Sequence, residues 1–159
     1  MQGHPAVIEL LNDVLTAELT AVNQYFVQAE MCANWGYRRL HKVLRERSIA
    51  EMRDAEALVK RILFLEGVPN MQRLGAVLVG ESVEEHLRLA LESERGAVEF
   101  LTDAIVHCAQ VGDYATRGLF EEMVREEEQH VDWLETQLET IRQIGVERYL
   151  SQQLGDDGA

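Results

Sequence analysis

Apolar side chains recur every three or four residues along most of the chain, a spacing that places them on one face of an α-helix. The first such stripe runs from about Pro5 to Asn34, and the second runs from about Arg38 to Glu66. A turn at Trp35-Gly36 separates the two stripes. The chain is therefore predicted to open with a long helical hairpin.

Residues 67–82 form a connection that is too long for a tight turn and that carries several apolar side chains. Ser82-Val83-Glu84-Glu85 has the spacing of a capping box, which predicts the start of a third helix. Gly112-Asp113 ends that helix, and the Asp113 side chain can cap a fourth one that continues to Gly145. A short fifth helical piece, about Val146 to Leu154, precedes a polar tail.

Two helical hairpins joined by a long crossover between the second and third helices have the topology of a ferritin-like four-helix bundle. The predicted fold class is therefore all-α, with a short fifth helix after the bundle. The chain has 159 residues, which is enough for one sizeable core, so residues 1–159 are expected to form a single domain. Helical periodicity by itself leaves other bundle architectures open.

The charge balance is strongly acidic, with 15 Lys and Arg against 28 Asp and Glu and a formal net charge of −13. Nucleic acids are excluded as partners, because binding the phosphate backbone requires a basic surface. An acidic surface suits cations, including metal ions, although it also serves solubility alone. The chain lacks both an apolar run of membrane-spanning length and a signal peptide. Together with two lone thiols, Cys32 and Cys108, this predicts a cytoplasmic protein.

Each of the four long apolar stripes is interrupted by one glutamate. The four residues are Glu18, Glu51, Glu94 and Glu127. A carboxylate on a buried helix face is unfavourable unless it is paired or bound to a metal. A single glutamate of this kind is most simply a partly exposed edge, but one in every helix is difficult to explain in that way.

The spacing of these glutamates repeats between the two halves of the chain. Glu18 and Glu51 are 33 residues apart, and so are Glu94 and Glu127. Each second member heads an i, i+3 pair on one helix face, Glu51 with Asp54 and Glu127 with His130. A di-iron carboxylate site takes one Glu from each of two helices and a Glu-x-x-His from each of the other two.

The ligand types also suit this interpretation, because carboxylate oxygens and imidazole nitrogens bind iron or manganese. The sequence therefore predicts a dinuclear metal site between the helices. The remaining acidic residues around the fourth-helix pair do not follow the apolar stripe and are interpreted as a solvated face. They are Glu121, Glu122, Glu126 and Glu128.

Several stretches resemble bacterioferritin, and the resemblance covers nearly the whole chain. They are Asn23-Gln24-Tyr25-Phe26, Asn34-Trp35-Gly36, Arg61-Ile62-Leu63-Phe64-Leu65-Glu66-Gly67, Glu126-Glu127-Glu128-Gln129-His130 and Asp132-Trp133-Leu134-Glu135. The resemblance implies a hollow shell of 24 subunits that oxidises ferrous iron, stores a ferric mineral and binds haem b across its twofold axes. A ferredoxin-type electron donor for iron release is a further implication.

The resemblance also assigns roles to individual positions. It implies that Glu18, Glu51, Glu94, Glu127 and His130 are di-iron ligands, with Glu51 and Glu127 bridging the two metals. Tyr25 matches the tyrosine that lies beside the metals in the family, and we take it as the candidate catalytic residue. A core aromatic with a satisfied hydroxyl is an equally good interpretation of Tyr25.

Met52 matches the methionine that ligates haem in the family. On a helix it lies about 100° from Glu51, so Met52 can face a neighbouring subunit while Glu51 faces the core. Without the resemblance, a methionine that fills a gap in the core would be the simpler interpretation. The residues that match the family's haem surroundings are Leu19, Val22, Asn23, Phe26 and Ile49.

The chain departs from the family pattern on the second helix. The family usually has Glu-x-x-His there, whereas this chain has Asp54 in place of the histidine. Inner-surface iron positions that often hold His and Asp are Glu46 and Ala50 here. We expect Asp54 to remain a metal ligand, because its oxygens and the near ring nitrogen of a histidine lie the same number of bonds from the β-carbon.

Three functions compete at this point. The first is a ferroxidase and iron store. The second is a haem-bearing subunit with an impaired ferroxidase site that co-assembles with a complete bacterioferritin subunit. The third is a di-iron oxygenase or peroxidase, but the 159 residues leave no room for a further substrate domain and this function would not explain Met52.

Overall fold

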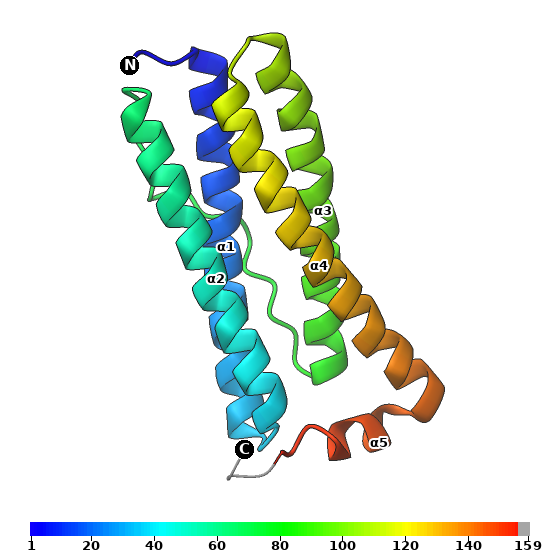
Figure 1. Ribbon diagram of the computed structural model, residues 1–159. Helices are drawn as coiled ribbons and strands as arrows, with labels where there is room; N and C mark the ends of the chain where they lie inside the picture. The colour runs from blue at the N-terminus through cyan, green and yellow to red at the C-terminus, as the bar shows by residue number, and fades with distance from the viewer. Residues whose placement is uncertain (156–159) are drawn as a thin grey trace.

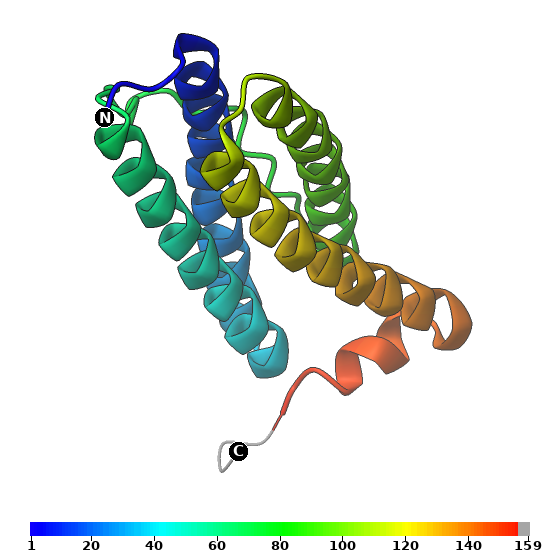
Figure 2. The same ribbon diagram turned by 45° about the horizontal axis from the view of Figure 1, so that its top comes forward.

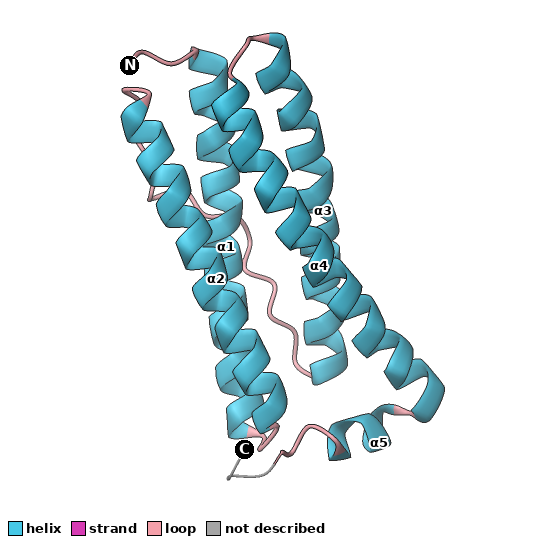
Figure 3. Cartoon of the chain, viewed as in Figure 1, coloured by secondary structure: helices cyan, strands magenta, loops and turns pink. Residues whose placement is uncertain are grey.

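The computed structural model describes residues 1–155, and helices are the only regular secondary structure in this range (Figure 3). The helices are α1 (Pro5–Asn34), α2 (Arg38–Phe64), α3 (Val83–Gln110), α4 (Tyr114–Ile144) and α5 (Val146–Ser151). The predicted all-α, ferritin-like bundle with a long crossover and a short fifth helix is confirmed. The last four residues of the predicted polar tail, 156–159, lie outside the described residues.

The four long helices pack as two antiparallel hairpins that lie side by side (Figures 1 and 2). α1 packs mainly on α2, and α3 packs mainly on α4. The short α5 turns across the end of the bundle beside the end of α4 (Figure 1). Its Tyr149 is buried and donates a hydrogen bond to Gln137 Oε1 at 2.8 Å, which fixes α5 to α4. No described helix is long and apolar enough to cross a membrane.

Two predicted helix ends and one predicted cap differ from the structure. α2 ends at Phe64 rather than Glu66, because Glu66 adopts a left-handed conformation with φ 62°. α5 ends at Ser151 rather than Leu154. The capping box of α3 is only half formed: Ser82 Oγ accepts from the Glu85 N–H, but the Glu85 carboxylate accepts from the N–H of Glu81 rather than of Ser82.

The crossover after α2 runs in an extended form along α1 until it reaches the start of α3 (Figure 1). A row of polar side chains on α1, spaced at multiples of four residues, holds it there through hydrogen bonds of 2.7 to 3.1 Å. The pairs are Asn12 with Val68 and Asn70, Thr16 with Arg73, Thr20 with Gly75, and Gln28 with Val79. The crossover is therefore a fitted part of the α1 face, and it carries the chain the full length of the bundle.

The apolar core is divided into two clusters along the bundle. One contains Leu11, Leu58 and Phe120, and the other contains Leu44, Leu87 and Leu134. The four glutamates of the helix stripes belong to neither cluster, although all four are buried. The helices therefore leave a polar layer in the middle of the bundle, between two apolar ends that hold it in position.

Candidate metal centre

The polar layer brings the predicted ligands into two groups whose oxygen or nitrogen atoms lie within 4.8 Å of one another. One group contains Glu51, Glu94, Glu127 and His130, and the other contains Glu18, Glu51, Asp54 and Glu127. Glu51 and Glu127 belong to both groups. Two four-ligand clusters that share two carboxylates have the arrangement expected of two adjacent cation positions with two bridges.

Several ligand atoms of this cluster are buried without a hydrogen-bond partner within the described residues. They are Glu18 Oε2, both carboxylate oxygens of Glu51, Glu127 Oε2, Asp54 Oδ2 and His130 Nδ1. Buried polar atoms without partners are rare, because each one loses its interaction with water. Their gathering in one polar layer, together with the carboxylate and imidazole donor types, fits divalent metal binding.

His130 faces all three carboxylates of the first group. Its Nδ1 is 3.4 Å from Glu51 Oε1, 3.7 Å from Glu94 Oε1 and 3.6 Å from Glu127 Oε2. The i, i+3 spacing puts Glu127 and His130 on the same face of α4, while α2 and α3 supply the other two carboxylates. The ring nitrogen and the three carboxylates therefore surround one point.

The ionisation of the cluster reflects its burial. Burial raises the pKa of Glu18 well above its usual value, and the Glu51 carboxylate adds to the shift. Burial also opposes ionisation of Glu51, but the neighbouring Glu18 and His130 side chains hold the pKa of Glu51 below its usual value. Burial disfavours the charged form of His130, yet Glu51 and Glu94 outweigh it and raise the pKa of His130. Without a bound cation, the cluster therefore retains protons at the points where cations would bind.

Tyr25 is buried beside this cluster and its hydroxyl donates a hydrogen bond to Glu94 Oε1. Burial and the nearby Glu94 carboxylate raise the pKa of Tyr25 well above its usual value, so the phenol keeps its proton. Both interpretations of Tyr25 from the sequence fit this geometry, because it is a core aromatic whose hydroxyl is satisfied by a candidate metal ligand.

Asp54 closes the second group on the side of α2 and is only partly buried. Burial, followed by the neighbouring Glu126 and Glu51 carboxylates, raises the pKa of Asp54 to about 8. Glu126 was interpreted from the sequence as part of a solvated face, but it is partly buried and acts directly on Asp54. Asp54 and Glu126 therefore extend the acidic cluster toward the surface between α2 and α4.

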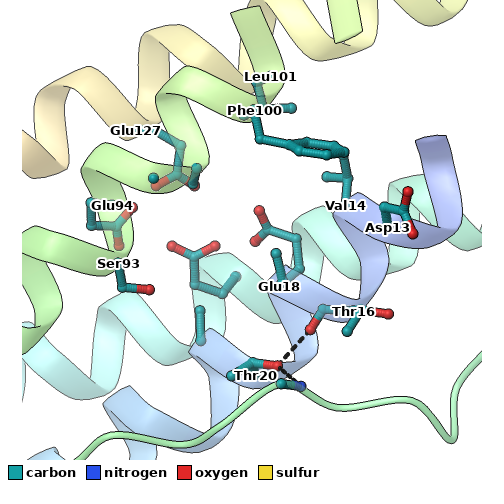
Figure 4. Close-up of a pocket in the computed structure, with 16 residues that line it drawn as sticks. Asp13, Val14, Thr16, Glu18, Thr20, Ser93, Glu94, Phe100, Leu101 and Glu127 are labelled. Atoms are coloured by element: carbon teal, nitrogen blue, oxygen red, sulfur yellow. Dashed lines mark hydrogen bonds between the residues drawn. The ribbon is translucent and has the colours of Figure 1, made fainter. Parts of the chain in front are cut away.

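A pocket of about 380 Å³ leads to the cluster from the side of α1 and α3. Glu18, Glu51, Glu94 and Glu127 lie at its base, and its walls include small residues such as Ala17, Ala21, Gly96 and Ala97. Figure 4 shows the carboxylates of Glu18, Glu94 and Glu127 turned toward one another, with the ring of Phe100 to one side. Gly75 of the crossover also lines the pocket, which connects the buried cluster with the protein surface.

The methionine predicted to bind haem lies on a different face of the molecule. Met52 and Phe26 are each 50% exposed, and Ile49 is 42% exposed. With Val22 these residues line a shallow pocket of about 270 Å³ between α1 and α2. Of the other predicted haem neighbours, Leu19 is buried and Asn23 donates to the Leu19 carbonyl, and neither lines this pocket.

The sequence did not single out three residues beside these sites. Arg45 and Ser48 line the Met52 pocket, and Ser48 Oγ donates to the Val22 carbonyl at 2.8 Å, which joins α2 to α1. Arg47 lies near the carboxylate cluster, with its guanidinium carbon 5.8 Å from the ring centroids of both Tyr25 and Trp133. Only the spacing of Arg47 from Glu51, one helical turn, was visible in the sequence, and that spacing is common.

Comparison with known proteins finds relatives across nearly the whole chain. Residues 8–144 match the sequence model of a family described as a ferritin-like domain. A bacterioferritin of Mycolicibacterium paratuberculosis is 46% identical over 152 residues, which cover 96% of this chain and 96% of that protein. A bacterioferritin of Brucella melitensis is 45% identical over 149 residues, covering 94% and 92%. A bacterioferritin of Streptomyces coelicolor is 46% identical over 151 residues, covering 95% and 90%.

Proposed function

The chain belongs to the bacterioferritins, a family of ferritin-like proteins, and we propose that it is an iron-storage subunit that oxidises ferrous iron inside its own bundle. The observation that carries this proposal is the pair of overlapping ligand groups that share Glu51 and Glu127. A single cation site would need only one of these groups. Two groups with common carboxylates favour two ferrous ions held side by side.

Each iron then has a distinct set of ligands. Glu94 and His130 would hold one ferrous ion, Glu18 and Asp54 would hold the other, and Glu51 and Glu127 would be shared by the two. Two adjacent ferrous ions can each release one electron, so together they supply the two electrons that, with two protons from solvent, reduce hydrogen peroxide to water or dioxygen to hydrogen peroxide. Tyr25 holds Glu94 through its hydroxyl and fixes the direction of that carboxylate.

The pocket between α1 and α3 gives substrates a route to this site from the protein surface. The four glutamates at its base attract ferrous ions, and the small side chains on its walls leave space for a small oxidant. On the other side of the site, Asp54 and Glu126 give the ferric product a path of carboxylates toward the surface between α2 and α4. Substrate and product are thus handled on opposite sides of the bundle.

Met52 marks a second cofactor site, for haem b. An exposed methionine within an apolar pocket fits haem, whose ring needs an apolar surface and whose iron accepts thioether sulfur. Met52 would hold the haem, and a second copy of the chain could offer its own Met52, because the pocket lies on an outer face. Bound haem would supply electron transfer, which would suit release of stored iron with a ferredoxin-type donor.

The same proposal includes a closed shell of 24 such subunits in the cytoplasm, with the mineral stored inside. The competing proposal is a haem-bearing subunit with weak oxidation that assembles with a complete bacterioferritin subunit. Asp54 favours this alternative, because it replaces the histidine of the family pattern. The two proposals differ in the chemistry of the isolated shell, so they can be separated by kinetics.

The test is rapid-mixing kinetics of ferrous iron oxidation by the homomeric shell. We expect a fast phase that saturates at two irons per subunit and that disappears in Glu127→Gln. The Asp54→His variant, which restores the family residue, should oxidise iron or transfer it to the mineral faster than the natural chain. A natural shell without a fast phase, in which Asp54→His creates one, would instead establish the alternative.

A further inference from the structure

Arg47 lies beside the proposed metal centre, although it is not a candidate ligand. It is on α2, one helical turn before Glu51. Its guanidinium carbon lies 5.8 Å from the ring centroid of Tyr25 on α1 and 5.8 Å from that of Trp133 on α4. The two aromatic rings hold the planar cation between three helices by cation–π attraction.

The charge of Arg47 is not used in an ion pair with any carboxylate of the described residues. Other arginines of the bundle do form such pairs, for example Arg61 with Asp113, Arg73 with Asp13 and Arg95 with Glu135. The charge of Arg47 instead lies beside the carboxylate cluster. The ring of Tyr25 that it contacts belongs to the side chain that donates to the candidate ligand Glu94. On α2, Arg47 also lies one helical turn before Glu51 and two turns before Asp54.

The charge balance of the proposed site identifies what this cation does. Four ligand glutamates carry four negative charges, which balance two ferrous ions. Asp54 adds a fifth negative charge where the family pattern has a neutral histidine. With both ferrous ions bound, the ligand set alone would therefore retain one surplus negative charge, which would hold iron too tightly. Arg47 supplies one positive charge at the same site.

We propose that Arg47 is the counter-charge to Asp54, a positioning residue that restores the neutrality of the two-iron site. This inference rests on the proposed function, because it assumes that the two ligand groups bind metal. Arg47 lowers the affinity of the site for divalent cations and Asp54 raises it. Together they keep the affinity low enough for oxidised iron to leave for the mineral.

The test is calorimetric titration of metal-free shells with Co²⁺, which needs no iron chemistry. We expect Arg47→Gln to bind Co²⁺ about tenfold more tightly, since an electrostatic coupling of this size is typical of charges near a buried site. Asp54→Asn should bind it more weakly by a similar factor. The double variant should return to within about threefold of the natural affinity, because the two charges are removed together.

Three further variants separate charge from packing. Arg47→Lys should keep the natural affinity, because it keeps the charge while changing the contact with the two rings. Arg47→Met should behave like Arg47→Gln, and it retains an apolar stem if the glutamine variant fails to fold. Lys42→Gln removes one positive charge from an exposed position of the same helix and should leave the affinity unchanged.

The inference is overturned if Arg47→Gln and Arg47→Met bind Co²⁺ equally or more weakly than the natural protein, or if Arg47→Lys behaves as they do. Either result would make Arg47 a packing residue. Failure of the proposed function looks different, because the natural shell would then bind fewer than two Co²⁺ per subunit. The stoichiometry of the natural protein and the affinity ratio of the variants therefore report on the two ideas separately.

Discussion

Replacing Asp54 with asparagine should stabilise the metal-free protein, although it removes a proposed ligand. In the folded chain, burial and then the Glu126 and Glu51 carboxylates raise the pKa of Asp54 to about 8. In the unfolded chain this carboxyl has an ordinary pKa of about 3.9. Between these two values the unfolded chain is ionised and the folded chain is not, so the folded state loses stability as pH rises from about 4 to about 8. Asparagine cannot ionise and removes this pH-dependent penalty.

The size of the effect follows from the shift in pKa. A shift of about four units corresponds to about 6 kcal/mol, at about 1.4 kcal/mol per unit. Asp54 is only partly buried, and screening by solvent reduces such values by half or more, which leaves about 2–3 kcal/mol at pH 8. Since pH 5 lies only about one pH unit above the unfolded-state pKa, the two chains should differ in unfolding free energy by less than about 1 kcal/mol at this pH.

The assay is urea denaturation of chelator-treated protein, followed by circular dichroism at pH 5 and pH 8. Natural and Asp54→Asn chains are compared at equal protein concentration, because assembly makes stability depend on concentration. Added Zn²⁺ is the matched control, and it should stabilise the natural chain more than the variant. A variant that is less stable at pH 8 without metal, or a difference that is equal at both pH values, would show that Asp54 is not held protonated in the folded metal-free chain.

Three further predictions concern other parts of the molecule. Asp113→Ala should destabilise the bundle by about 2–4 kcal/mol in chemical denaturation, because α4 loses its N-cap and Arg61, only 18% exposed, loses its ion-pair partner. Hydrogen bonds from Thr116 and the nearby Arg61 overcome the burial of Asp113 and lower its pKa. The stabilisation by Asp113 is therefore present above about pH 4 and is lost as pH falls through the lower pKa of the folded state. Met52→Leu should abolish haem absorbance while the shell keeps its size by light scattering, and stoichiometric haem in the purified variant would disprove the assignment. Gly96→Phe, at a position where an added side chain meets open space, should fill the pocket and slow iron oxidation without changing Co²⁺ affinity, whereas unchanged oxidation kinetics would show that substrates use another route.

The helices were predictable where their starting signals are local. Pro5 in the first helical turn, Ser82 before α3 and Asp113 before α4 each act within a few residues, and the structure begins its helices at these points. The end of α2 was not predictable in this way. The left-handed conformation of Glu66 belongs to the chain reversal into the crossover, whose position is set by hydrogen bonds with α1.

The site was predictable to the extent that burial leaves a pattern in the sequence. Glu18, Glu51, Glu94 and Glu127 interrupt apolar stripes, so their convergence follows from the helix period. Arg47 leaves no such pattern, because its position depends on rings contributed by α1 and α4.

The polar row on α1 was visible in the sequence as a four-residue spacing, but the partner that it binds was not. Asn12, Thr16 and Thr20 form hydrogen bonds with the extended crossover. Nothing in the spacing of these residues specifies an extended loop as their partner. Pairing between distant segments is decided in three dimensions, and a single sequence carries it only weakly.

We propose that one chain holds two metal ions between its four long helices. A crystal structure of the shell saturated with iron or Co²⁺, with metals located by anomalous scattering, would show these ions. We expect two ions per subunit, bridged by Glu51 and Glu127, with His130 on one ion and Asp54 on the other. One ion or none among these residues, or an Asp54 side chain turned away from both ions, would rule out the proposed two-metal site.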